Sequence, residues 1–398
     1  MSIENDSAVA SDVTCKSRRD FLRGSALAGA AGLAAAMGGL PGGLPARAAE
    51  SSGRTLQVWA CGGLAEAMMS AHEEYERLRG VTFLPARMHR HREETSMNAR
   101  HPCFNVSAAG QCERIHLPVA PDCNISCAYC NRKTDCPNES RLGVCSRVLG
   151  PEEAAALVDK AARHSPSLAV VGIASPGDPL ANPELTLRVL ELVRRRHPRL
   201  LLCLSTNGLV LADYATALKS LGVGHITMTM NAVTPAVACR IYHGVRVNAC
   251  SYYGQKAAEI LLDKQERALA TLAWHGLAVK VNTVVMPGIN DEHVEEIARF
   301  AARFKVELMN CIGLIPLPGT AMSALAAPSA KRMAELRQRA GKYVLQMRHC
   351  ARCRADAFGL LSRHSPIEAV FEEGLRSPHC SLPSHSLDAF QEKEKLSC

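Results

Sequence analysis

Short apolar runs and helical patterns alternate along the chain from about residue 115 to residue 314. The runs have the length of strands, and the segments between them place apolar residues on one face of a helix. Pro151 and Pro183, each followed by glutamate, mark two helix starts. The expected strands are 115–120, 168–173, 200–205, 225–229, 279–285 and 307–314, and the expected helices are 151–164, 183–197, 211–221, 255–275 and 291–304.

Strands that alternate with helices in this way predict a parallel sheet covered by those helices. The fold class is therefore α/β, a partial (β/α)6 TIM-like barrel with N- and C-terminal extensions. In such barrels the chemistry lies at the C-terminal ends of the strands. The loops that follow the first three strands are thus the first place to search for a site.

The first strand leads directly into Cys123, Cys127 and Cys130, which have the spacing C-x3-C-x2-C. Three thiolates on one short loop can hold three irons of a [4Fe-4S] cluster. The fourth iron then has an open position for a cosubstrate, the S-adenosylmethionine (SAM) of the radical SAM pattern. In that superfamily the aromatic residue before the last cysteine, here Tyr129, packs beside the SAM adenine. The alternatives are a zinc site, which usually has two C-x2-C pairs, or buried free thiols.

The loops after the second and third strands contain Gly177, Asp178, Ser205 and Asn207. Gly177 allows a close approach of the backbone, and Asp178 or neighbouring carbonyls can meet the SAM ammonium. Ser205 and Asn207 offer groups for the SAM carboxylate or ribose. Pro-Gly-Asp-Pro and Thr-Asn-Gly are also ordinary turn sequences. Their positions, one and two strands after the cysteine loop, favour SAM contacts.

The composition narrows the classes of function. The 398 residues allow one large domain with extensions, and 47% of them are apolar. The formal charge of +8 is dispersed and only 4% of residues are aromatic, so we expect no nucleic-acid partner. The chain has 17 cysteines, and their clustering in short motifs favours metal binding over disulfides.

Five further cysteines stand in or near these motifs, more than a single-cluster enzyme needs. They can hold additional iron–sulfur clusters near the radical site. Cys203 falls within a predicted strand and has a plain core thiol as its alternative. His349 is either a ligand or a histidine at a helix end. The five are Cys103, Cys136, Cys203, Cys350 and Cys353.

From His101 to about Leu361 the chain resembles the nitrogenase cofactor maturases of the NifB family. The resemblance covers about two thirds of the chain. The residues that carry it are the strings 101–104, 115–121 with its continuation to 133, 135–141, 171–174, 177–182, 202–208, 307–310 and 347–350.

The resemblance implies a lyase-type radical SAM enzyme that fuses two [4Fe-4S] clusters and inserts a SAM-derived carbide. It implies that Cys136, Cys350 and Cys353 hold one precursor cluster, and that Cys103 and Cys203 help to hold the other. The implied partners are iron–sulfur scaffold and electron donor proteins and nitrogenase cofactor carrier proteins.

Residues 105–112 depart from the family pattern, because the expected histidine is absent there. His101 and Cys112 are the candidates to replace it. Two other classes of function stay open: another radical SAM maturase, and a non-enzymatic iron–sulfur carrier. A carrier would not turn over SAM, which distinguishes it from both enzymes.

Residues 1–48 read as a twin-arginine signal, with Arg18 and Arg19 before an Ala/Gly-rich run. The alternative is a disordered Ala/Gly arm. We expect no stable membrane span, because Ala and Gly make the run weakly hydrophobic. Residues 49–96 resemble a fragment of a periplasmic molybdate-type binding protein, with strands at 55–60 and 80–83.

The remaining segments are a radical SAM core at 97–361 and an irregular tail at 362–398. SAM chemistry indicates a working enzyme in the cytoplasm, whereas a functional export signal would predict the periplasm.

Overall fold

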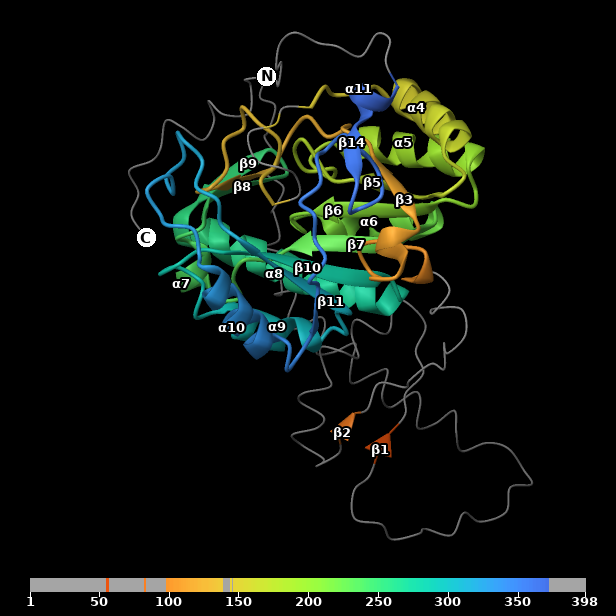
Figure 1. Cartoon of the computed structure of the whole chain (residues 1–398). Helices are drawn as coiled ribbons and strands as arrows, with labels where there is room; N and C mark the ends of the chain where they lie inside the picture. Colours follow the sequence, from red (N-terminus) through yellow and green to blue (C-terminus); the bar gives the residue numbers. More distant parts are fainter. Residues whose placement is uncertain (1–54, 57–81, 84–97, 139–143, 145, 372–398) are drawn as a thin grey trace, which may run out of the picture. The chain divides into compact units, whose positions relative to one another are not determined.

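The computed structural model describes residues 55–56, 82–83, 98–138, 144 and 146–371 (Figure 1). The chain divides into two units, Met1–Arg90 and His91–Cys398, which are taken separately. In the first unit, β1 (Thr55–Leu56) pairs in parallel with β2 (Thr82–Phe83). The predicted twin-arginine segment and the rest of the predicted binding-protein fragment lie outside the described residues.

A parallel sheet forms the centre of the second unit, as the alternation of strands and helices predicts. Its six central strands lie side by side in the order of the chain, and a helix follows each of the strands β5, β6 and β10 (Figure 1). These strands are β3 (Glu113–His116), β5 (Leu168–Ile173), β6 (Leu201–Thr206), β7 (Val223–Thr229), β10 (Ala278–Val285) and β11 (Leu308–Gly313). The predicted helices are α4 (Pro151–His164), α5 (Pro183–Arg196), α6 (Leu211–Ser220), α8 (Gly254–His275) and α9 (Val294–Ala302). The α/β fold class is confirmed.

Three short strands extend this sheet at its two edges. β12 (Leu345–Gln346) pairs in parallel with β11. At the other edge, β13 (Ala357–Gly359) and then β14 (His364–Pro366) add antiparallel strands beside β3. The segment predicted as an irregular tail from residue 362 therefore begins with a paired strand, which α11 (Ile367–Val370) follows. Strands of two or three residues are too short for a visible alternation, so the sequence pattern does not reveal them.

A second, smaller sheet contains the cysteine loop. β4 (Ile125–Cys127) pairs with β8 (Tyr242–Val247), and β8 pairs with β9 (Cys250–Tyr253), all antiparallel. Other short elements are η1 (Ala108–Gly110), α7 (Pro235–Ala238) and α10 (Ala330–Ala340). Within the described residues, no helix is both long enough and apolar enough to cross a membrane.

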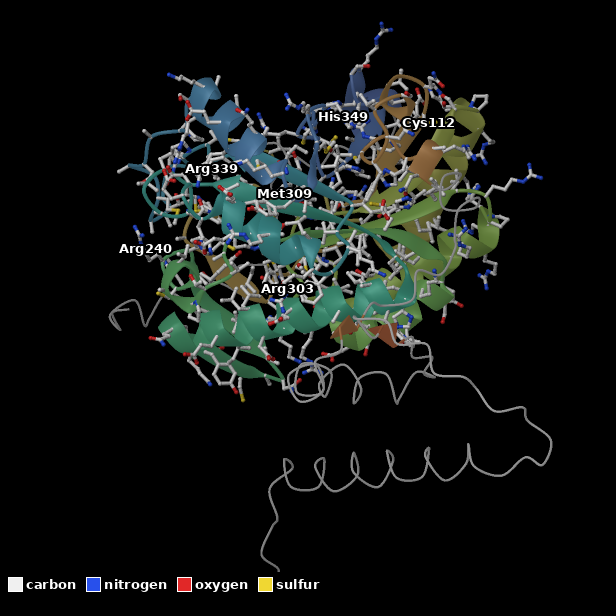
Figure 2. All side chains as sticks on the ribbon, turned by 90° about the horizontal axis from the view of Figure 1, so that it is seen from below. Cys112, Arg240, Arg303, Met309, Arg339 and His349 are labelled. Carbon is white, nitrogen blue, oxygen red and sulfur yellow. The ribbon has the colours of Figure 1, made fainter. Side chains whose placement is uncertain are left out.

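The two faces of the central sheet differ in chemistry. The side chains on one face of the strands pack in the main hydrophobic core. Met309 of β11, labelled in Figure 2, is one of them and is fully buried. Side chains of a strand alternate between faces, so the residues between these core positions point to the inside of the barrel. The core set includes Ile115, Val171, Leu202, Leu204, Ile226, Val281 and Met309. The inner set includes Arg114, His116, Cys203, Ser205, Thr227, Lys280, Asn282 and Asn310, which are polar or sulfur-bearing.

Candidate functional site

The cysteine loop is held in place by backbone hydrogen bonds. Cys127 is the last residue of β4, so part of the predicted loop is a strand. The amide of Ala128 donates to the carbonyl of Ile241 at 2.8 Å, and the amide of Cys130 donates to the carbonyl of Cys127 at 3.0 Å. These bonds fix the backbone of the loop that carries the three thiols.

Burial is the largest influence on the pKa values of these three thiols. It raises the pKa of Cys130 to about 11 and also raises the pKa values of Cys123 and Cys127. The nearby Arg132 guanidinium opposes these shifts at Cys123 and Cys130. Iron binds thiolates, so cluster binding would displace the thiol protons, and Arg132 would lower the electrostatic cost of the resulting charge.

Hydrogen bonds to two backbone carbonyls hold the Arg132 side chain in place. It donates to the carbonyls of Pro121 at 2.7 Å and Pro176 at 3.2 Å. Its Nε is buried and lacks a hydrogen-bond partner among the described residues. Three thiols beside a half-buried arginine whose buried Nε has spare hydrogen-bonding capacity fit an anionic cluster. Within the described ranges, no three His, Cys, Asp or Glu side chains converge as ligands of one metal ion would, but cluster thiolates bind separate irons.

The close packing of two loops requires glycine at position 177. These are the cysteine loop with the residues just before it, and the loop that follows β5. A Cβ on Gly177 would lie 1.9 Å from the carbonyl oxygen of Asp122. The Gly177 amide donates to Ala120 at 2.6 Å, and the Asp178 amide donates to Asp122 at 2.7 Å. Close backbone approach is thus the reason for glycine here, as predicted, although the partner in the structure is another loop.

The Asp178 carboxylate joins the second loop, which follows β5, to the third loop, which follows β6. It accepts from the Thr206 hydroxyl at 2.9 Å and from the Asn207 amide at 2.6 Å. It also accepts from the Leu180 amide at 2.9 Å. These donors engage the carboxylate within the protein. A SAM contact of Asp178 stays a prediction.

Asn207 and Ser205 face different surroundings. The Asn207 amide group donates to Asn124 Oδ1 at 2.7 Å and so binds the third loop to the cysteine loop. Ser205 lines the interior cavity, and its Oγ is buried with no partner among the described residues. Of the predicted pair, Ser205 therefore has the group with unused hydrogen-bonding capacity.

Tyr129 is almost fully buried, and its hydroxyl accepts from Asn231 Nδ2 at 2.8 Å. Its ring lines a small hollow between the ends of β10 and β11, together with Val284 and Leu314. This hollow measures about 10 Å³, which is room for about one water molecule, so the predicted contact of Tyr129 with the SAM adenine stays a prediction.

Four of the five additional cysteines meet in one cavity. Cys103, Cys203, Cys350 and Cys353 line a cavity of about 70 Å³ inside the barrel. Cys203 is therefore not a plain core thiol. Cys136 does not line this cavity; its charge acts on Arg132 and Tyr129, which places it beside the cysteine loop. The assignment of these thiols to two precursor clusters stays a prediction.

Hydrogen bonds tie the distant segments of this cavity together. Arg114 Nη2 donates to Cys353 Sγ at 2.8 Å, and its other terminal nitrogen donates to the carbonyl of Gly359. His349, labelled in Figure 2, donates from Nε2 to the carbonyl of Pro102 at 3.0 Å. His349 thus joins the Cys350 segment to the Cys103 segment. It lies in an irregular segment and not at a helix end, and its part as a ligand stays a prediction.

The two candidates for the missing histidine lie in different places. His101 lines the cavity, and its Nε2 is buried without a partner among the described residues. The Cys103 amide donates to His101 Nδ1 at 3.2 Å, so Nε2 bears the proton in the neutral ring. Cys112, which follows the C-terminal end of η1 and is labelled in Figure 2, does not line the cavity.

Several cavity residues were absent from the sequence-based prediction. Arg114, His116, Lys280, Asn282 and Asn310 all line the cavity from the central strands. The signal was present: polar residues recur at every second position of strands that are otherwise apolar. Such an alternation within a buried strand indicates a polar interior face.

Comparisons with known proteins agree with this geometry. Residues 117–301 match the family model of the radical SAM superfamily. The FeMo cofactor biosynthesis protein NifB of Chlorobaculum tepidum is 46% identical over 68% of this chain and 64% of its own length. That of Klebsiella pneumoniae is 45% identical over 66% of this chain and 57% of its own length.

The NifB protein of Methanocaldococcus jannaschii is 40% identical, and the match covers 69% of this chain and 90% of that protein. The chain thus spans nearly all of the archaeal relative but less than two thirds of the two bacterial ones. Among solved structures, Streptococcus suis SuiB bound to S-adenosylmethionine has a TM-score of 0.43 at 13% identity, covering 71% of this chain and 62% of that chain.

Proposed function

The chain belongs to the NifB family, and we propose that it is a radical SAM maturase of nitrogenase cofactor biosynthesis. In this proposal it fuses two [4Fe-4S] precursor clusters and inserts a SAM-derived carbide, giving the eight-iron precursor of the cofactor. The observation that carries the proposal is the convergence of Cys103, Cys203, Cys350 and Cys353 in one cavity inside a radical SAM barrel.

Cys123, Cys127 and Cys130 would hold the SAM-binding cluster, which supplies the electron that cleaves SAM. Other residues of these loops would stabilise the cluster site and hold its loops in place. Arg132 would offset the thiolate charge. The contacts of Asp178 with Thr206 and Asn207 hold the loops after β5 and β6 together, and the bond from Asn207 to Asn124 holds the loop after β6 to the cysteine loop. Tyr129, which is almost fully buried at the end of the cysteine loop, would pack beside the adenine of SAM.

The precursor clusters are the substrates, and the cavity thiols would bind them. Cys350 is exposed whereas Cys353 is buried, so the Cys350–Cys353 pair reaches from the surface to the interior. This arrangement would let the exposed Cys350 thiol receive a cluster from a scaffold protein. The proposed partners are accordingly an iron–sulfur scaffold, an electron donor and a nitrogenase cofactor carrier.

The test is anaerobic reconstitution with iron and sulfide, followed by dithionite and SAM. Iron and 5′-deoxyadenosine are measured on the same sample. Iron sufficient for three clusters together with 5′-deoxyadenosine would support the maturase. Iron for one cluster only would exclude it.

A second candidate is a non-enzymatic iron–sulfur carrier. The observation that favours it is the departure at residues 105–112, where Ala108, Ala109 and Gly110 form η1 and offer no ligand. A carrier would bind iron in the same assay and form no 5′-deoxyadenosine.

The cellular compartment in which this protein works is a separate proposal. SAM and a low-potential electron donor are cytoplasmic, so we place the working enzyme in the cytoplasm. N-terminal sequencing of the native protein tests this: a mature protein that begins at Ala49 would indicate export instead.

A further inference from the structure

The cavity that contains the four thiols is positively charged. Its lining includes Arg114, Lys280 and Arg352 and, among the described residues that form it, no aspartate or glutamate. Charges in the interior of a protein are costly unless an opposite charge or strong hydrogen bonds offset them. A cavity with this lining therefore favours an anionic guest.

Lys280 has an unusual position for a lysine. It lies on β10 with only 6% of its surface exposed, in a strand whose residues are all buried. Its Nζ lies 5.9 Å from the centre of the Phe104 ring, and its charge acts on the Cys103 thiol. Lys280 thus brings positive charge to the Cys103 side of the cavity.

Arg114 has the corresponding position on the other side. Its guanidinium donates to Cys353 Sγ at 2.8 Å. The Gly359 carbonyl, which also accepts from Arg114, holds this guanidinium in a fixed orientation. Two cations thus lie beside two different thiols of the same cavity.

We propose that Lys280 is a positioning residue for the precursor cluster beside Cys103, whose negative charge it balances. The proposal rests on the function proposed above. A cube of iron and sulfide held by thiolates is a net anion, and its potential depends on nearby charge and hydrogen bonds. A buried ammonium stabilises the more negative, reduced form of such a cluster and so raises its potential.

The test compares Lys280→Met, which keeps the length of the side chain but removes the charge, with Lys280→Arg, which keeps the charge. Lys331→Met, at an exposed position of α10, is the matched control. The full chain is reconstituted anaerobically with iron and sulfide, without SAM. The measurements are iron per chain, the electron paramagnetic resonance spectrum and the midpoint potential of each cluster.

We expect Lys280→Met to bind less iron in the cavity, or to bind it with a lower midpoint potential, while the signal of the cluster at Cys123, Cys127 and Cys130 stays unchanged. Lys280→Arg should restore both properties, whereas a merely structural role would not follow the charge. Equal iron and equal potentials in Lys280→Met and the control would overturn this inference alone. If the unmodified chain binds only the cluster of the cysteine loop, this inference and the proposed function both fail.

Discussion

The carbonyl oxygen of Asp122 occupies the place that a side chain at Gly177 would need, at 1.9 Å from the Cβ position. This contact joins the loop before the cluster cysteines to the loop after β5. Three of the sequence-predicted site residues, Gly177, Asp178 and Asn207, therefore act in the structure as connections between loops.

Gly177→Ala is expected to separate these loops, because the obstructing atoms belong to the backbone. Overpacking of this kind costs about 1–3 kcal/mol of the free energy of unfolding. We expect a lower Tm and less iron bound at Cys123, Cys127 and Cys130. Gly110→Ala is the control, since a Cβ at Gly110 meets nothing within 4 Å. Equal effects of the two substitutions would contradict the packing argument.

Asp178→Asn is expected to weaken the link between the second and third loops. The new amide would place a donor against the Thr206 hydroxyl or the Asn207 amide, and an unsatisfied buried group costs about 1–3 kcal/mol. Thermal unfolding and equilibrium SAM binding measure the effect. Asp263→Asn, on the exposed side of α8, should leave both properties as they are.

Cys353→Ser is expected to remove a thiol from the cavity without disturbing the cysteine loop. The reconstituted variant should lose iron yet retain the cluster at Cys123, Cys127 and Cys130, and with it the formation of 5′-deoxyadenosine. The exposed Cys250 provides the control variant Cys250→Ser, which should keep all of its iron. A Cys353→Ser protein with the full iron content would show that the Cys353 thiol is not needed to hold a cluster.

The stability of the protein should fall as the pH falls from 6.5 toward 4. Burial lowers the pKa of His225 from 6.5 to about 4, so the folded state keeps this imidazole neutral while the unfolded state takes up a proton. The unfolded state is therefore favoured below its own pKa, by about 2 kcal/mol between about pH 7 and about pH 5 for this group.

Burial also lowers the pKa values of His101 and His116, which act in the same direction. Urea unfolding at the two pH values measures the total loss. His225→Gln should reduce the loss, because glutamine does not titrate. An unchanged pH dependence in this variant would show that His225 does not contribute.

The sequence and the tertiary structure contributed different parts of this site. The spacing of Cys123, Cys127 and Cys130 is a short-range property, and so is the alternation of strands with helices. Both can therefore be predicted from the chain, and five of the six central strands were predicted within about two residues of their bounds. The first was wrong in its bounds, because it was predicted at 115–120 and β3 ends at His116. The short strands β12, β13 and β14 were not, because two or three residues make no periodic pattern.

The fold class, the cysteine loop and the surplus thiols follow from short-range patterns in the chain. The meeting of Cys103 and Cys353 in one cavity does not, because these residues are distant in the chain and the pairing of β13 with β3 brings their segments together. The tertiary structure also decided that Lys280 points inward and that Asp178 holds a loop. Side chains alternate between the two faces of each strand, and only the packing of the helices and the C-terminal segment against the sheet determines which face lines the cavity.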